Sequence, residues 1–183
     1  MSVGPRSTRS GVTLVELLVT VSLVAIILTL AVPGFRTLIA NAKMTNAANS
    51  LIGHLHFARS EAVKRNLRVK VCPSVDGQTC LSASLSLWHP GYIVGVIDDA
   101  GNLVPPILRR VDPDEMQGVR IDSGGRRSFV YQGDGSAEGS EGTLKICDPG
   151  DPTRIRQVVV NRMGRTYVRC NEPSAYSCPA TCP

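Results

Sequence analysis

The chain has 183 residues, of which 43% are hydrophobic and 19% are charged, and its formal net charge is +5. This composition suits a folded domain of modest size with an appendage and argues against a disordered chain. Residues 1–11 include Arg6 and Arg9 and no acidic residue, so the rest of the chain carries a charge of +3. A charge this small argues against a uniformly cationic nucleic-acid binder, and any contact with a polyanion must come from a local patch.

The N-terminal leader is basic, and an apolar run begins directly after Gly11. By the positive-inside rule, residues 1–11 stay in the cytoplasm. A secretory signal peptide has a cleavage site of A-x-A type after its apolar run, whereas the sequence there is AVPGFR. We therefore expect the apolar segment to survive in the mature protein as a membrane anchor.

The anchor, residues 12–32, has Glu16 as its only charge. As a helix it is long enough to cross about 30 Å of hydrocarbon. A carboxylate inside a membrane helix costs about 2.5–3.5 kcal/mol, so it needs compensation. Cleavage after Gly11 would place a new amino group on Val12, one helical turn before Glu16 or close to Glu16 of a neighbouring subunit. The alternative is that Glu16 reaches the membrane interface, as in an ordinary anchor.

Residues 33–66 are predicted to continue the helix as an amphipathic half. Pro33 removes a backbone donor and crowds the preceding turn, so with Gly34 it predicts a kink. The alternative is that these two residues end the membrane helix, but helix-compatible sequence resumes at Phe35. One helical face then carries four apolar residues, and Asn66 is the expected stop. The four residues are Leu51, Leu55, Ala58 and Ala62.

Residues 67–183 change to alternating and short apolar segments separated by Gly, Pro, Asp and Asn. These are candidate antiparallel strands, and a helix followed by such strands predicts an α+β domain in which the sheet covers the helix's apolar face. The candidate strands are residues 68–72, 85–88, 92–97, 107–111, 119–121, 129–131, 143–147, 157–160 and 166–169.

All six cysteines follow the anchor, and an even number in an exported region predicts disulfides. The short loops favour local bridges between Cys72 and Cys80 and between Cys178 and Cys182, which would leave Cys147 with Cys170. Zinc is the alternative, but the chain has no Cys-x-x-Cys pair and its histidines are not at ligand spacing, so we expect no metal. The tail after Cys170 is predicted to be a stapled loop.

The segment GVTLVELL, residues 11–18, resembles the class III signal of type IV pilins and pseudopilins. The resemblance implies that a prepilin peptidase cuts between Gly11 and Val12 and methylates Val12, and that Glu16 helps the subunit enter a filament. It also implies a single-pass inner-membrane protein with its C-terminal domain in the periplasm, later placed in an extracellular pilus or a periplasmic pseudopilus. One departure is Val12, where the family usually has Phe.

A second set of motifs, in the same order along the chain, resembles the GspH/FimT family of minor pilins and pseudopilins. The motifs are LHFARSEAVKRN (residues 55–66), WHPGY (88–92), DDAGN (98–102), GTLKIC (142–147) and VVVNRMGR (158–165). The resemblance implies a minor pilin, a structural and assembly subunit without enzymatic activity at the tip or in the initiation complex of a pilus. Its expected partners are other pilins, through the N-terminal helix, and the inner-membrane assembly platform. The alternative is the minor pseudopilin of type II secretion.

No catalytic set is visible in the sequence, and we expect no cofactor. His54 and His56 lie two residues apart and point to different sides of the predicted helix. The segment Asp98–Asn102 carries oxygen ligands but lacks the alternating acids of a calcium loop, so it predicts a β-turn.

Arginines gather near the C-terminus, where guanidinium groups suit phosphate oxygens. The segment GRTYVR, residues 164–169, resembles a stretched form of the G-R-x-R element with which FimT-like DNA-uptake pilins contact DNA. The resemblance implies a DNA site at Arg162, Arg165 and Arg169, with Tyr167 able to stack on a base. The alternative is an edge strand whose charges discourage aggregation.

Overall fold

The computed structural model describes residues 11–81, 87–116 and 118–170. The chain forms two compact units, Met1–Ile39 and Ala40–Pro183, and each is described by itself. One helix, α1 (Leu14–Arg65), contributes to both units. The predicted leader, residues 1–10, and the predicted tail loop, residues 171–183, lie outside the described residues.

The helix α1 continues through Pro33 and Gly34, so the alternative that these residues end it is wrong. A proline removes one hydrogen bond from the helix interior, and long flanking segments of apolar helix-formers keep the helix on both sides. The kink expected at Pro33 stays a prediction.

The C-terminal end of α1 is closed by a Schellman-type cap. Asn66 has a left-handed backbone with φ of 52°. The N–H of Leu67 donates to the carbonyl of Ala62 at 3.2 Å, as this cap requires. The predicted stop at Asn66 is therefore confirmed.

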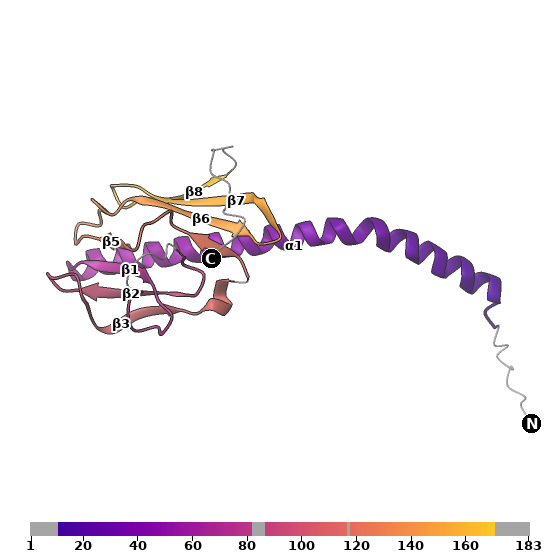
Figure 1. Ribbon diagram of the computed structural model, residues 1–183, viewed down its shortest axis with the longest axis horizontal. Coiled ribbons are helices and arrows are strands. Elements are labelled where there is room, and N and C mark those ends of the chain that lie inside the picture. Colours follow the sequence, from indigo (N-terminus) through magenta and orange to yellow (C-terminus); the bar gives the residue numbers. More distant parts are fainter. Residues whose placement is uncertain (1–10, 82–86, 117, 171–183) are drawn as a thin grey trace, which may run out of the picture. The chain divides into compact units, whose positions relative to one another are not determined.

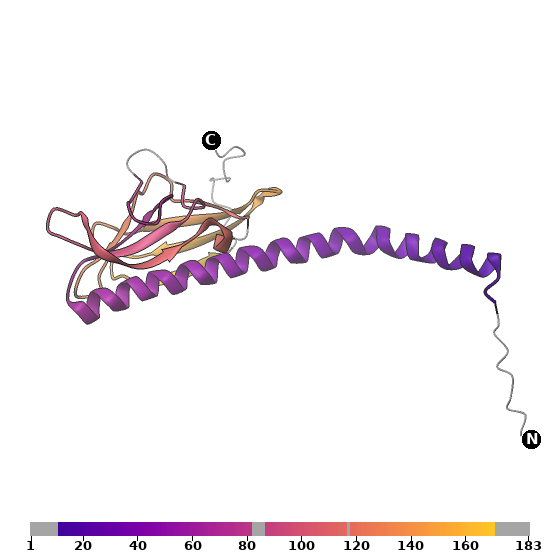
Figure 2. The same cartoon turned by 90° about the horizontal axis from the view of Figure 1, so that it is seen from below.

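Two four-stranded antiparallel sheets pack on the second half of α1 (Figures 1 and 2). The first has the order β3-β2-β1-β5 and the second the order β4-β6-β7-β8. The strands are β1 (Val69–Pro73), β2 (Tyr92–Ile97), β3 (Leu103–Val111), β4 (Arg120–Asp122), β5 (Phe129–Tyr131), β6 (Gly142–Asp148), β7 (Asp151–Val160) and β8 (Thr166–Cys170). A short 3-10 helix, η1 (Pro113–Met116), joins β3 to β4.

The predicted α+β class is confirmed, with small differences in the strands. β3 begins at Leu103, earlier than predicted, and runs through Pro105 and Pro106, which an edge strand tolerates. β7 begins at Asp151, also earlier than predicted. In the segment predicted as residues 85–88, Leu87 forms an isolated bridge with Asp122, and residues 82–86 lie outside the described part.

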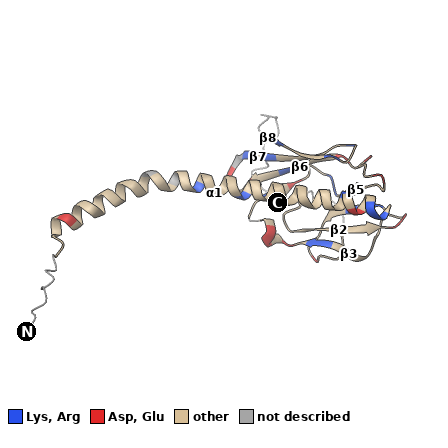
Figure 3. Ribbon diagram, turned by 180° about the vertical axis from the view of Figure 1, so that it is seen from behind, with Lys and Arg blue, Asp and Glu red and all other residues tan. Residues whose placement is uncertain are grey.

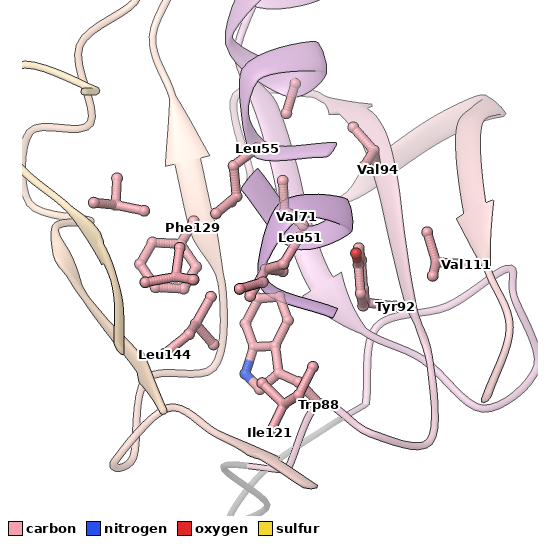
Figure 4. Packing of buried hydrophobic residues seen from close by; sticks show 14 of the residues in the cluster. Leu51, Leu55, Val71, Trp88, Tyr92, Val94, Val111, Ile121, Phe129 and Leu144 are labelled. Carbon is pink, nitrogen blue, oxygen red and sulfur yellow. The ribbon is translucent and has the colours of Figure 1, made fainter. Parts of the chain in front are cut away.

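The core lies between the second half of α1 and the inward faces of both sheets (Figure 4). The predicted helical face is fully buried: Leu51, Leu55, Ala58 and Ala62 are all 0% exposed. Opposite it lie Trp88, Tyr92 and Phe129, and the Trp88 ring centroid is 5.9 Å from that of Tyr92 and 5.5 Å from that of Phe129. These aromatic contacts join β2 and β5 of the first sheet to Trp88, whose backbone N–H donates to the carbonyl of Ile121 in β4 of the second sheet at 2.9 Å.

Candidate assembly and interaction sites

The start of α1 is fixed by a capping arrangement. Thr13 Oγ1 accepts a hydrogen bond from the backbone N–H of Glu16 at 3.2 Å. A threonine three residues before a glutamate is the capping-box pattern, in which the glutamate side chain can return to the threonine N–H. The carboxylate of Glu16 therefore lies in the first turn, beside the positive end of the helix dipole. The spacing of Thr13 and Glu16 could have revealed this cap in the sequence.

The first half of α1 exposes its apolar side chains on all sides. Val12 is 71% exposed, Leu14 is 75% exposed, and the pattern persists beyond Pro33 to Phe35 and Leu38, each 66% exposed. This part of α1 is long and apolar enough to cross a bilayer, and its most apolar window has no residue buried within the chain. Charged residues are sparse along it (Figure 3). Such a surface marks contact with lipid or with other proteins.

Near the C-terminal end of α1, Arg59 joins the helix to two turns. Its Nε donates to the carbonyl of Gly135 at 2.8 Å, and its Nη2 donates to the carbonyl of Met163 at 3.1 Å. Gly164 has φ of 72°, and a Cβ there would overlap the carbonyl oxygen of Gly135. The turn between β7 and β8 is thus clamped against α1, which brings the arginine of the ARSEA segment next to the later Gly-Arg pair.

The predicted DNA-contact residues lie on this turn and on the edge strand β8. Tyr167 and Arg169 alternate with Val168, whose side chain packs against the core, so the first two share the outer face of the sheet. Tyr167 is 42% exposed, and Arg165 is exposed immediately before the strand. Arg162 instead forms an ion pair with Glu138, which competes with any phosphate. The structure therefore brings Tyr167 and Arg169 to one face, with Arg165 exposed next to them in the chain.

The described cysteines are oxidised. Cys72 and Cys80 form a disulfide with their Cα atoms 5.5 Å apart, so this predicted bridge is confirmed. Cys147 is also disulfide-bonded. The side chains of Cys170, Cys178 and Cys182 lie outside the described part, and the pairings predicted for them stay predictions.

Comparison with known proteins agrees with this architecture. A family model described as Type II transport protein GspH matches residues 47–164. The chain belongs to the GspH family. A second family model, the prokaryotic N-terminal methylation motif, matches residues 6–32. As a GspH-family protein the chain is of the minor pilin and pseudopilin type, which assembles with other pilins in a pilus or pseudopilus and is a structural rather than a known enzymatic class.

Solved structures share the fold of this GspH-family chain. Two crystal forms of the type IV minor pilin FimU from Pseudomonas aeruginosa, each 23% identical, superpose with TM-scores of 0.57 and 0.54. They cover 76% and 74% of this chain, and 95% and 97% of their own. At this identity the likeness shows the fold. No curated protein sequence matches the chain significantly.

The other candidate sites of the sequence have structural roles. The segment Asp98–Asn102 forms the predicted turn, in which the N–H of Gly101 donates to the Asp98 carbonyl at 3.0 Å. The Asp98 carboxylate accepts the Asn102 N–H at 2.8 Å, and hydrogen bonds from Asn102 hold the pKa of Asp98 below its usual value. Within the described residues, no three His, Cys, Asp or Glu side chains lie close enough to hold a metal ion.

The two histidines of α1 lie in different surroundings, as their spacing predicted. His54 is half-buried, and its Nδ1 lies 2.7 Å from the hydroxyl of Tyr92. Burial lowers the pKa of His54, and the nearby Arg109 lowers it further. His56 is exposed. His54 is therefore a packing residue that ties α1 to β2.

Proposed function

We propose that the chain is a minor type IV pilin, a structural and assembly subunit placed at the tip or in the initiation complex of a pilus. The observation that supports this most directly is the first half of α1, which exposes apolar side chains on all sides directly behind a methylation motif. In this proposal residues 12–32 hold the protein in the inner membrane, and residues 67–183 form a periplasmic domain until the subunit is incorporated.

Processing precedes assembly in this proposal. A prepilin peptidase cuts between Gly11 and Val12 and methylates the new amino group. The Thr13 cap supports this cut site, because it starts the helix just beyond it and keeps Glu16 in the first turn. Glu16 then pairs with the amino group of a neighbouring subunit in the filament core, while the inner-membrane assembly platform inserts the chain.

The role of Glu16 is tested with a Glu16→Gln variant. We expect the variant to reach the membrane at the wild-type level but to be depleted from sheared filaments, as measured by immunoblot of both fractions. Ser22→Ala is the matched control, because Ser22 is a polar residue of the same segment whose hydroxyl donates to the Leu18 carbonyl of its own helix. Wild-type amounts of Glu16→Gln in filaments would reject the proposal.

A second candidate is the minor pseudopilin of type II secretion, which the description of the matched family favours. Cross-linking in cells distinguishes the two assemblies, because the chain would be captured with pilins in one case and with secretion pseudopilins in the other.

A third candidate is a DNA receptor for natural transformation, favoured by the shared outer face of Tyr167 and Arg169 next to Arg165. Gel-shift titration of the full chain in detergent tests it. The receptor proposal expects a salt-sensitive shift that the double variant Arg165→Ala, Arg169→Ala removes. A control with the same charge change, Arg109→Ala with Arg127→Ala, should keep the shift. No shift, or the same shift in all proteins, would reject the receptor.

A further inference from the structure

The first sheet has an outer face that α1 does not cover. Along β1, Val69 and Val71 face the core, so Lys70 and Cys72 face away from it. The register pairs Lys70 with Gly95 and Cys72 with Ile93, which places these residues of β2 on the same outer face. Two segments rise above this face and leave a hollow between them.

One wall of the hollow is the loop closed by the Cys72–Cys80 disulfide. Inside this loop the Asp76 carboxylate accepts the Thr79 hydroxyl at 2.6 Å and the N–H groups of Thr79 and Gln78, both at 2.8 Å, and these hydrogen bonds lower the pKa of Asp76. Arg110 Nη1 donates to the Asp76 carbonyl at 3.3 Å and ties the loop to β3. The wall is therefore fixed by a covalent bond and by a hydrogen-bonded turn.

The opposite wall is an outward bulge of β3. Val96 of β2 pairs with Val104 of β3, and Val94 of β2 pairs with Arg109 of β3. The chain of β3 is therefore longer than that of β2 between these two pairs. Ile107 of this irregular stretch and the preceding Leu103 carry aliphatic side chains over Gly95, where a Cβ would lie 2.8 Å from Leu103 Cδ2 and 3.5 Å from Ile107 Cδ1. Because Gly95 has no side chain, Leu103 and Ile107 can lie directly against the backbone of β2, and their aliphatic groups form the wall of the hollow.

The hollow is a cavity of about 710 Å³, a size typical of small-ligand sites. Of the described residues that line it, Lys70 is the one with a charged side chain, and none is acidic. Its ammonium donates to the carbonyl of Gly101, which leaves two N–H groups for a ligand. Gln78 adds an amide, and Leu103, Pro105 and Ile107 supply aliphatic wall.

We propose that this pocket binds a carboxylate carried on a short aliphatic group, with the carboxylate on Lys70 and the aliphatic part against Leu103 and Ile107. A single ammonium in a mostly apolar, preformed pocket favours one negative charge. No aromatic side chain lines the described part of the pocket, so it offers no platform for a sugar or a base. An arginine fork, which phosphate binding favours, is absent from the same lining residues.

The chemistry fits two sources, the C-terminus of a polypeptide and a small free acid. The test uses the full chain in maltoside micelles and the fluorescent peptide dansyl-Gly-Ala-Val, with either a free or an amidated C-terminus. We expect saturable fluorescence anisotropy for the free acid and affinity at least about tenfold weaker for the amide, because the two differ in the charge that Lys70 contacts. This comparison uses the wild-type chain, so it does not depend on the folding of a variant.

The Lys70→Met variant keeps the aliphatic stem, and it should bind the peptide with a free C-terminus about tenfold or more weakly than the wild type does. Lys64→Met, at an exposed lysine of α1, should bind as wild type. Displacement by valerate would identify a small acid as ligand, and failure of valerate to displace the peptide would identify a polypeptide C-terminus. Equal binding of acid and amide, equal displacement by inorganic phosphate, or no saturable binding up to about 5 mM would overturn the proposal.

Discussion

The two halves of α1 differ in how far their apolar side chains are buried by the rest of the chain. In residues 14–39 apolar side chains point in all directions and stay exposed, as Leu17 at 57% and Leu38 at 66% illustrate. In residues 40–65 they follow one face and are buried, as Met44 at 2% and Leu51 at 0% illustrate. The second half is stabilised by the chain's own sheets. The first half leaves its apolar side chains exposed within the described part of the chain, and such a surface suits contact with lipid or other proteins.

The largest expected effect is a difference in the free energy of unfolding between variants at two leucines of α1. Leu51→Ala should lower the free energy of unfolding of the domain by about 2–5 kcal/mol, because it removes buried methyl groups and leaves a cavity. Leu38→Ala should change it by no more than about 0.5 kcal/mol, because the Leu38 side chain is 66% exposed. The readout is the fluorescence of Trp88, the one tryptophan of the chain, which is 0% exposed, during urea unfolding in maltoside. Equal losses of unfolding free energy in the two variants would contradict the difference between the two halves of α1.

The next effect concerns the clamp that Arg59 makes between α1 and the turn from β7 to β8. Gly139 and Gly164 have nearly the same φ, 74° and 72°, but a Cβ meets nothing within 4 Å at Gly139 and overlaps backbone at Gly164. Gly139→Ala should cost about 1–2 kcal/mol for its left-handed backbone. Gly164→Ala should cost about 1–3 kcal/mol more from steric overlap. The same urea experiment measures both, and equal costs would show that the clamp is not tight.

A smaller effect is the pH dependence of the contact between α1 and β2. Burial lowers the pKa of His54 below its usual 6.5, so the unfolded chain takes up this proton first as the pH falls. Stability is therefore present above about pH 6.5 and is lost on acidification below it. His54→Gln should reduce the fall in melting temperature between about pH 7.5 and 5.5.

His56→Gln, on the exposed side of the same helix turn, should retain the wild-type fall. Part of the fall should remain in the His54 variant, because burial also lowers the pKa of His89. An unchanged pH profile in His54→Gln would contradict the role given to its burial.

Periodicity was enough to predict most of the fold. The spacing of Leu51, Leu55, Ala58 and Ala62 identified the buried face of α1, and alternation located the strands. Local spacing also identified the bridge from Cys72 to Cys80. These features depend on residues close together in the sequence, where helix and strand geometry fix which side chains share a face.

Features that depend on contacts between distant segments could not be predicted. The clamp joins Arg59 to Gly135 and Met163, and no local pattern pairs an arginine of a helix with two turn carbonyls far along the chain. The pairing of Arg162 with Glu138 was missed for the same reason, although it bears on the proposed DNA site. The pocket around Lys70 depends on an irregular strand register that sequence periodicity does not encode.

The central claim is that the exposed first half of α1 belongs to a processed pilin subunit. Mass spectrometry of the mature protein extracted from membranes tests it most directly. The account predicts a chain that begins at Val12 and carries one methyl group on its new amino terminus. An intact chain beginning at Met1, or one cleaved after the apolar segment, would contradict it.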